Sequence, residues 1–131
     1  MIFEKSIDMS AENAVLRFKE LAKENGLGVL WEQNLKEKFK EKGFFYSYNT
    51  YVLEVCNPEV ALNVLNTTNQ AAYFMPCKVS VFETEEDVKI GFAKPSKFIG
   101  ELDNGDESKH YIADVEDVLM NIIETMASET F

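Results

Sequence analysis

The segment from Tyr51 to Phe92 constrains the fold more than any other part of the chain. It alternates short β-prone runs with one strongly signalled helix, whose start is Asn57-Pro58-Glu59. Asn is a strong N-cap, proline fits the first helical position, and glutamate favours the positive end of the helix dipole. The segment therefore predicts a compact unit, made in chain order of a strand over 51–56, this helix, a strand over 77–83, an acidic turn and a strand over 88–92.

The remaining hydrophobic spacing predicts further elements on both sides of this unit. They are a strand over 2–9, a helix capped by Ser10 and ended near Gly26, a strand over 28–32, a short charged helix over 34–42, a turn or short helix over 96–102 and a final helix over about 109–127. This order predicts an α+β fold, a two-layer α/β sandwich with a single mostly antiparallel sheet and helices packed on one face. We find no linker, so residues 1–131 are expected to form a single domain.

Length and composition favour an ordinary globular protein. A chain of 131 residues with 46% hydrophobic content buries enough surface to fold without a disulfide or a metal. The first residues lack the apolar core of a signal peptide, and no run approaches the roughly 18 apolar residues of a membrane span. We therefore expect a soluble cytoplasmic protein with no membrane partner, in which both cysteines are reduced.

The charge balance argues against nucleic acid as a partner. The chain carries 13 basic and 23 acidic residues, a formal net charge of −10. Binding a polyanion requires clustered lysine and arginine, and the field of an acidic protein repels phosphates. The most basic stretch, from Lys36 to Lys42, is interleaved with Glu37 and Glu41, which is typical of an exposed helix face.

Cys56 is the candidate reactive thiol, because it directly precedes the helix that begins at Asn57-Pro58. The free amides and the dipole at a helix N-terminus favour a thiolate. No lysine, arginine or histidine lies within several residues, and Glu54 and Glu59 are close by. The simpler interpretation is a small hydrophobic side chain that ends a strand, and both interpretations stay open.

Strand alternation predicts that the two cysteines point to opposite sides of the sheet. Cys56 shares a face with Val52 and Glu54, whereas Cys77 shares a more apolar face with Val79 and Val81. If helices cover the more apolar face, Cys77 points into the core and Cys56 points away from it. A disulfide between them is then excluded, unless a bulge at Pro76 intervenes.

Other catalytic or metal chemistry finds no support. His110 is the single histidine, expected in an exposed position, and no set of four ligands has the spacing of a zinc site. There is no Gly-x-Ser-x-Gly elbow and no phosphate-binding glycine loop. We therefore expect no metal, no cofactor and no catalytic residues, and hydrolase activity is the weakest of the hypotheses.

Aromatic residues are the remaining candidates for a binding surface. They are Phe44, Phe45, Tyr46, Tyr48, Tyr51, Tyr73 and Phe74. Most such clusters belong to a hydrophobic core, but they can also line a pocket or a dimer surface. The sheet face that carries Leu30, Val52 and Cys56 has no helix left to cover it. An apolar patch there would favour self-association or a ligand cleft.

Three pieces of sequence resemble a bacterial and archaeal family called domain of unknown function 302. They are Gly26-Leu27-Gly28-Val29-Leu30, Glu54-Val55-Cys56-Asn57-Pro58 and Met75-Pro76-Cys77-Lys78-Val79, and the similarity runs from about Phe3 to Met126. The resemblance implies a two-layer domain, a homodimer and no established activity. By position, the motif residues of the family would be Cys56, Asn57, Pro58, Pro76 and Cys77.

Two functional hypotheses follow. The first is a small acidic homodimeric binding or accessory module, with an unidentified small ligand and no catalysis of its own. The second is a thiol-based protein that acts through Cys56 as a sulfur carrier, a redox sensor or a binder of a soft ligand.

Overall fold

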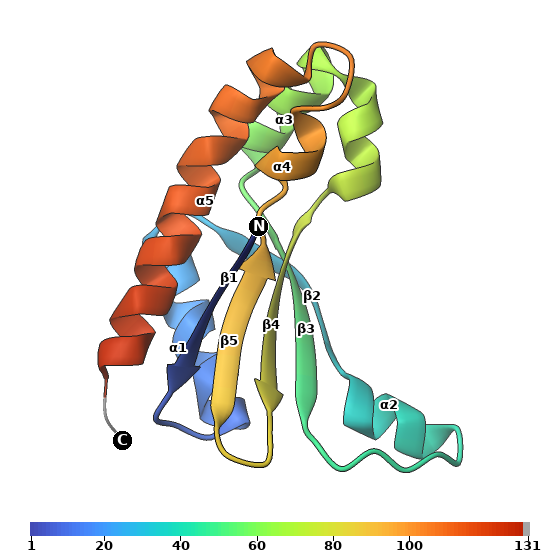
Figure 1. Ribbon diagram of the computed structural model, residues 1–131, viewed down its shortest axis with the longest axis vertical. Helices are drawn as coiled ribbons and strands as arrows, with labels where there is room; N and C mark the ends of the chain where they lie inside the picture. The colour runs from blue at the N-terminus through green and yellow to red at the C-terminus, as the bar shows by residue number, and fades with distance from the viewer. Residues whose placement is uncertain (130–131) are drawn as a thin grey trace.

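A computed structural model describes residues 1–129 and shows one five-stranded sheet (Figure 1). Every neighbouring pair of strands is antiparallel, and the strands lie in the order β1-β5-β4-β3-β2. The strand bounds are β1 Ile2–Ile7, β2 Gly28–Asn34, β3 Thr50–Cys56, β4 Cys77–Glu83 and β5 Val88–Ala93. The predicted α+β sandwich is confirmed, and β1 and β2 form the two edges of the sheet.

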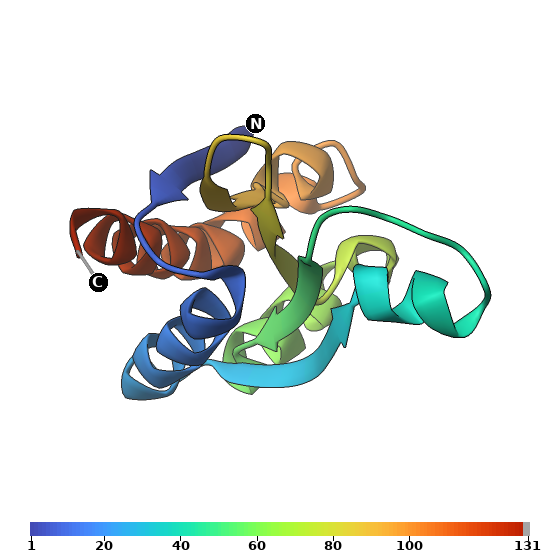
Figure 2. The same ribbon diagram turned by 90° about the horizontal axis from the view of Figure 1, so that it is seen from below.

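The two long helices lie together on one side of the strands (Figure 2). The helical elements are α1 Ala11–Glu24, α2 Leu35–Glu41, α3 Pro58–Thr67, the 3₁₀ helix η1 Asn69–Phe74, α4 Ser96–Ile99 and α5 Gly105–Ser128. Helices α3 and α4 and η1 gather at one end of the sheet, and α2 lies at the other end (Figure 1). Within residues 1–129, none of the helices has the length and apolar character needed to span a bilayer.

The core lies between the sheet and the helices α1 and α5. Alternate residues of the central strands point into it, and Leu53, Val55, Val79 and Val81 are almost completely buried. Phe18 of α1 and the apolar stripe of α5 cover them, with Leu119, Ile123 and Met126 fully buried. The alternating apolar side chains of the strands and the apolar stripes of α1 and α5 therefore pack against each other in one hydrophobic layer.

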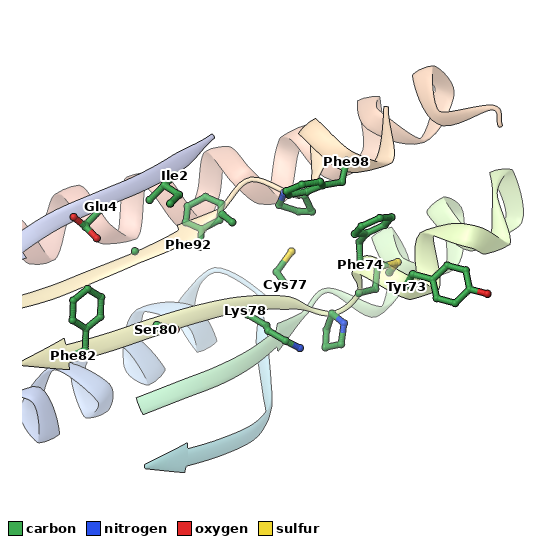
Figure 3. Close-up of a pocket in the computed structure, with 15 residues that line it drawn as sticks. Ile2, Glu4, Tyr73, Phe74, Cys77, Lys78, Ser80, Phe82, Phe92 and Phe98 are labelled. Atoms are coloured by element: carbon green, nitrogen blue, oxygen red, sulfur yellow. The ribbon is translucent and has the colours of Figure 1, made fainter. Parts of the chain in front are cut away.

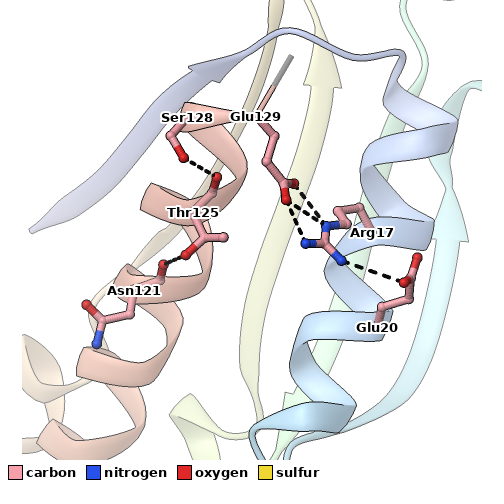
Figure 4. Close-up of polar contacts among 6 residues, drawn as sticks. All are labelled: Arg17, Glu20, Asn121, Thr125, Ser128 and Glu129. Carbon is pink, nitrogen blue, oxygen red and sulfur yellow. Dashed lines mark hydrogen bonds and ion pairs between the residues drawn. The ribbon is translucent and has the colours of Figure 1, made fainter. Parts of the chain in front are cut away.

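Arg17 joins α1 to the end of α5 (Figure 4). Its Nη2 lies 2.6 Å from Oε2 of Glu129, and its Nε donates to Oε1 of the same carboxylate at 2.9 Å. This paired geometry lowers the pKa of the Glu129 carboxyl. The contact fixes the two helices side by side over the sheet.

Local capping signals have the geometry that the sequence predicts. The Oγ of Ser10 accepts a hydrogen bond from the amide of Asn13, and Oδ1 of Asn57 accepts from the amides of Glu59 and Val60. Gly26 has a φ of +75° just after α1, the left-handed conformation that glycine favours at a helix end.

Three local features differ from the expectation. Helix α5 begins at Gly105, before the predicted start near residue 109, and only glycine allows this turn, because a Cβ at Gly105 would meet the carbonyl oxygen of Ile99 at 2.0 Å. Residues 69–74, for which the sequence predicts no element, form the separate helix η1. A bulge at Leu30 shifts the register of β2, so Trp31 opposes Glu54 while Val29 opposes Val55.

The cap at the start of α3 gives a direct test of this local structure. Replacing Asn57 with Ala should lower the free energy of unfolding by about 1 kcal/mol, because two amides lose their acceptor. Chemical denaturation measures this change. Asn66→Ala, at the exposed far end of the same helix, is the matched control and should leave stability unchanged or slightly raised. Equal stability of the Asn57→Ala variant and the wild type would contradict the assignment.

Candidate functional site

The face of the sheet that points away from α1 and α5 has no helical layer over it (Figure 2). One row of directly paired residues crosses this open face through all five strands: Glu4, Gly91, Ser80, Val52 and Gln33. Trp31 lies on the same face, since it is paired with Glu54, and 43% of its surface is exposed. We call this surface the open face. Val52 therefore lies on an uncovered face as predicted, whereas Cys56, predicted on the same face, borders a small cavity lined by α3 and α5.

An apolar cavity with a volume of about 450 Å³ opens on this face (Figure 3). We call it the sheet pocket. Its lining is mostly apolar, and the apolar residues are Ile2, Tyr73, Phe74, Met75, Pro76, Phe82, Phe92, Ala93, Pro95 and Phe98. A cavity of this size and composition is typical of a site that binds an apolar group.

The sheet pocket forms where β4 and β5 separate. Their pairing ends at Val79 and Phe92, so Cys77 and Lys78 extend beyond the last residue pair of the ladder. The chain before β4 comes from η1, and the chain after β5 enters α4. Phe74 and Phe98, one from each of these helices, stack with 5.5 Å between ring centroids and an interplanar angle of 9°. The stacked pair closes the end of the pocket.

A buried carboxylate holds α4 in place for this contact. Glu116 of α5 accepts hydrogen bonds from the amide of Ser96 at 2.8 Å and from the hydroxyl of Ser96 at 2.7 Å. Ser96 begins α4, so the carboxylate satisfies a free amide at a helix start. Phe98, two residues further on, is thereby fixed at the pocket wall.

Gly91 keeps the pocket floor open and lets β1 approach β5 closely. A Cβ at this position would meet the carbonyl oxygen of Phe3 at 2.5 Å and the Cα of Glu4 at 3.0 Å. A side chain here would push against the backbone of β1 and also enter the pocket.

The polar groups of the pocket are few, and each of its two charged residues pairs with a residue outside the lining. Nζ of Lys78 lies 3.5 Å from Glu54, and Glu4, which also lines the pocket, lies 3.4 Å from Nζ of Lys89. Ser80 supplies the remaining hydroxyl. In residues 1–129, neither Ser80 nor Cys77 of the lining forms a side-chain hydrogen bond with a basic side chain. Across residues 1–129, no three histidine, cysteine or acidic side chains group in a way that could hold a metal ion.

Cys77 lines the sheet pocket from the core side, and its side chain points away from that of Lys78 (Figure 3). It is buried, as the sequence predicts, and burial raises the pKa of its thiol to about 12, with a smaller contribution from the Glu116 carboxylate. The thiolate needed for reactivity is therefore strongly disfavoured.

Cys56 is half-buried and does not line the sheet pocket. Burial raises the pKa of this thiol too. Both thiols are free, and both border a second cavity of about 20 Å³ beneath α3 and α5, which has room for about one water molecule. The sequence did not anticipate this shared cavity, because Cys56 lies at the very end of β3, where the chain already turns into α3. The reactivity of Cys56 stays a prediction.

The other motif positions have structural roles around the same region. Asn57 caps α3, and Pro58 is its first residue. Pro76 lines both cavities, next to Cys77. The motif residues therefore gather at the end of the sheet where β3 ends and β4 begins, beside the sheet pocket.

The aromatic residues fall into two surface groups instead of the core. Tyr73 and Phe74 line the sheet pocket, whereas Phe44 and Phe45 lie in the loop after α2 and are 70% and 87% exposed. Tyr51 alone packs partly against the core.

Phe82, Phe92 and Phe98 were missed as pocket residues, because their association depends on how β4 and β5 separate, which no local pattern encodes. His110 is exposed, as expected.

Fold and site together define a small α+β domain with an uncovered sheet face and an apolar pocket. The chain belongs to the family described as Domain of unknown function DUF302, whose model matches residues 3–126. It is similar to an uncharacterized conserved DUF302 protein from Bacillus stearothermophilus, whose crystal structure superimposes with a TM-score of 0.88. The two chains are 34% identical, over 95% of this chain and 97% of that one. No curated protein matches the chain.

Gly91 allows a test of the pocket floor. Gly91→Ala should destabilise the protein by about 1–3 kcal/mol, because the new methyl group displaces the backbone of β1. Gly28→Ala is the matched control, since its Cβ would have no neighbour closer than 3.8 Å. Thermal unfolding of both variants measures the difference. Equal stability of the two would show that β1 does not lie as close to β5 as described.

Proposed function

We propose that this protein is a cytoplasmic, homodimeric binding module without catalysis of its own. The observation that carries the proposal is the open face of the sheet, which holds a largely apolar pocket of about 450 Å³. A large exposed apolar patch on a protein often marks a contact with a partner. A second copy of the chain is the simplest partner, because a two-fold interface lets the same surface serve both subunits.

The polar residues of the open face suit such an interface. Lys78 pairs with Glu54, and Lys89 pairs with Glu4, within the same chain. Each pair neutralises itself, so closing the face against another surface leaves no unmatched charge on these four residues. Between the pairs, Val52, Phe82 and Trp31 provide apolar surface.

Light scattering coupled to size-exclusion chromatography tests the proposal. The wild type should have the mass of a dimer at micromolar concentrations, and Val52→Glu should be monomeric, because the new charge lies on the open face beside the central strand β4. Leu16→Glu, at an exposed position of α1 in the helical layer, is the control and should remain dimeric. A wild type that stays monomeric throughout this range overturns the proposal.

The second candidate function is a thiol protein acting through Cys56. It is favoured by the position of Cys56 immediately before the Asn57 cap of α3. The pKa values of the thiols argue against this function, because burial raises the pKa of Cys56 and of Cys77 and so disfavours the reactive thiolate.

Thiol titration across pH decides between these candidates. We expect the native protein to react slowly with a disulfide reagent at neutral pH, with a rate that rises only above the ordinary thiol pKa of about 8.5, because burial raises the pKa of both thiols. Cys56→Ser assigns the reacting group. Rapid reaction of Cys56 at pH 7, with an apparent pKa clearly below about 8.5, would establish the thiol function instead.

A further inference from the structure

The second unpartnered apolar feature of this chain is the segment that joins β2 to β3. It consists of α2 and the loop over 42–49, and we call it the arm. The arm extends from the sheet on the side away from α1 and α5 (Figure 2). Helix α2 contains no buried residue, so the core of this chain does not explain its apolar side chains.

The arm is held in a defined shape at its base. Nδ2 of Asn34 donates to Oδ1 of Asn49 at 2.9 Å, which ties the two ends of the arm together. Tyr46 makes edge contacts with Phe39 at 5.8 Å and with Tyr48 at 6.0 Å between ring centroids. These contacts order the arm without covering its tip.

The tip of the arm presents two adjacent phenyl rings to solvent. Gly43, with a φ of +86°, ends α2 and turns the chain into Phe44 and Phe45. Exposed fractions of 70% and 87% are high for phenylalanine, and adjacent exposed aromatics are typical of a contact with a partner.

The charge of the arm is opposite to that of the rest of the chain. Residues 35–48 contain four lysines and two glutamates, a net charge of +2, while the whole chain carries −10. The remainder therefore carries −12. A second copy of this chain offers an acidic body to the basic arm, and opposite charges assist association.

We infer that the arm of one copy inserts Phe44 and Phe45 into the sheet pocket of a second copy, and that the second copy does the same in return. This inference rests on the proposed homodimer and names the apolar group that its pocket binds. No residue of the arm lines the pocket of its own chain, although both features lie on the open side of the sheet.

The dimensions of the pocket fit this occupant. A dry cavity of about 150 Å³ is large enough for one benzene ring, so a pocket of about 450 Å³ accommodates both phenyl rings. Its walls are themselves aromatic, and Phe74, Phe98 and Phe82 offer ring faces and edges for stacking. The exchange is reciprocal, so the assembly closes at two subunits.

The double variant Phe44→Ser/Phe45→Ser tests the exchange. Its fold should be intact by circular dichroism, because both side chains are exposed in the monomer, while its dimer dissociation constant should rise at least about tenfold. Leu16→Ser/Leu62→Ser is the matched control, because it removes two side chains that are 55% and 60% exposed outside the arm and the pocket. The control should dimerise as the wild type does.

The outcomes separate this inference from the proposed function. A monomeric wild type overturns both. A dimeric wild type with an equally dimeric arm variant overturns the exchange alone and leaves the homodimer standing. Arm-dependent binding of the wild type to phosphatidylcholine vesicles containing phosphatidylglycerol, without an arm-dependent dimer, would assign the tip to a lipid surface and overturn the exchange.

Cross-linking locates the tip directly. Phe45→Cys protein mixed with Ala93→Cys protein should form a disulfide-linked heterodimer under mild oxidation, since Ala93 is an exposed residue of the pocket wall. Leu62→Cys mixed with Ala93→Cys is the control and should not form one. Failure of the Phe45→Cys and Ala93→Cys pair to link, in a mixture shown to be dimeric, contradicts insertion into the pocket.

Discussion

A single layer of helices covers one face of the sheet, and this constraint governs the rest of the structure. Helices α1 and α5 bury the side of β3 and β4 that carries Leu53, Val55, Val79 and Val81, and the Arg17–Glu129 pair fixes the two helices side by side. No comparable element remains for the opposite side. Within residues 1–129, the apolar side chains of the open face therefore lack a helical cover, and this exposure is the basis of the proposed contact with another molecule.

The pocket on that face arises from the way the elements at one end of the sheet are anchored. Glu116 holds the start of α4, η1 leads into β4, and the stacked rings of Phe98 and Phe74 join the two across the gap between β4 and β5. Cys77 lies at the inner wall as a protonated thiol. The lining of this pocket is mostly apolar, and Cys77 is the one motif cysteine among the described residues that borders it.

The sequence predicts what local rules determine. Ser10, Asn57 and Gly26 act at the helix ends where their chemistry favours them, and alternation in β3 and β4 identifies the core side of the sheet. The misjudged features depend on contacts between distant segments. The early start of α5 requires the close approach of Gly105 to Ile99, and the position of Trp31 follows from a bulge that the alternating pattern of β2 does not reveal. Tyr73 and Phe74 are among the aromatic residues that the sequence offers for a pocket, but the complete pocket could not be predicted, because its walls combine the N-terminal strand β1 with residues between 73 and 98.

Trp31 is the single tryptophan and lies on the open face, so its fluorescence reports directly on whether that face is covered. Emission spectra and acrylamide quenching should be recorded as the protein is diluted through its dimer dissociation. Burial of the open face predicts a blue-shifted, protected tryptophan at high concentration that becomes red-shifted and readily quenched as the mass falls to that of a monomer. A spectrum and a quenching constant that stay unchanged while the dimer dissociates would contradict the account, because the subunits would then meet through another surface.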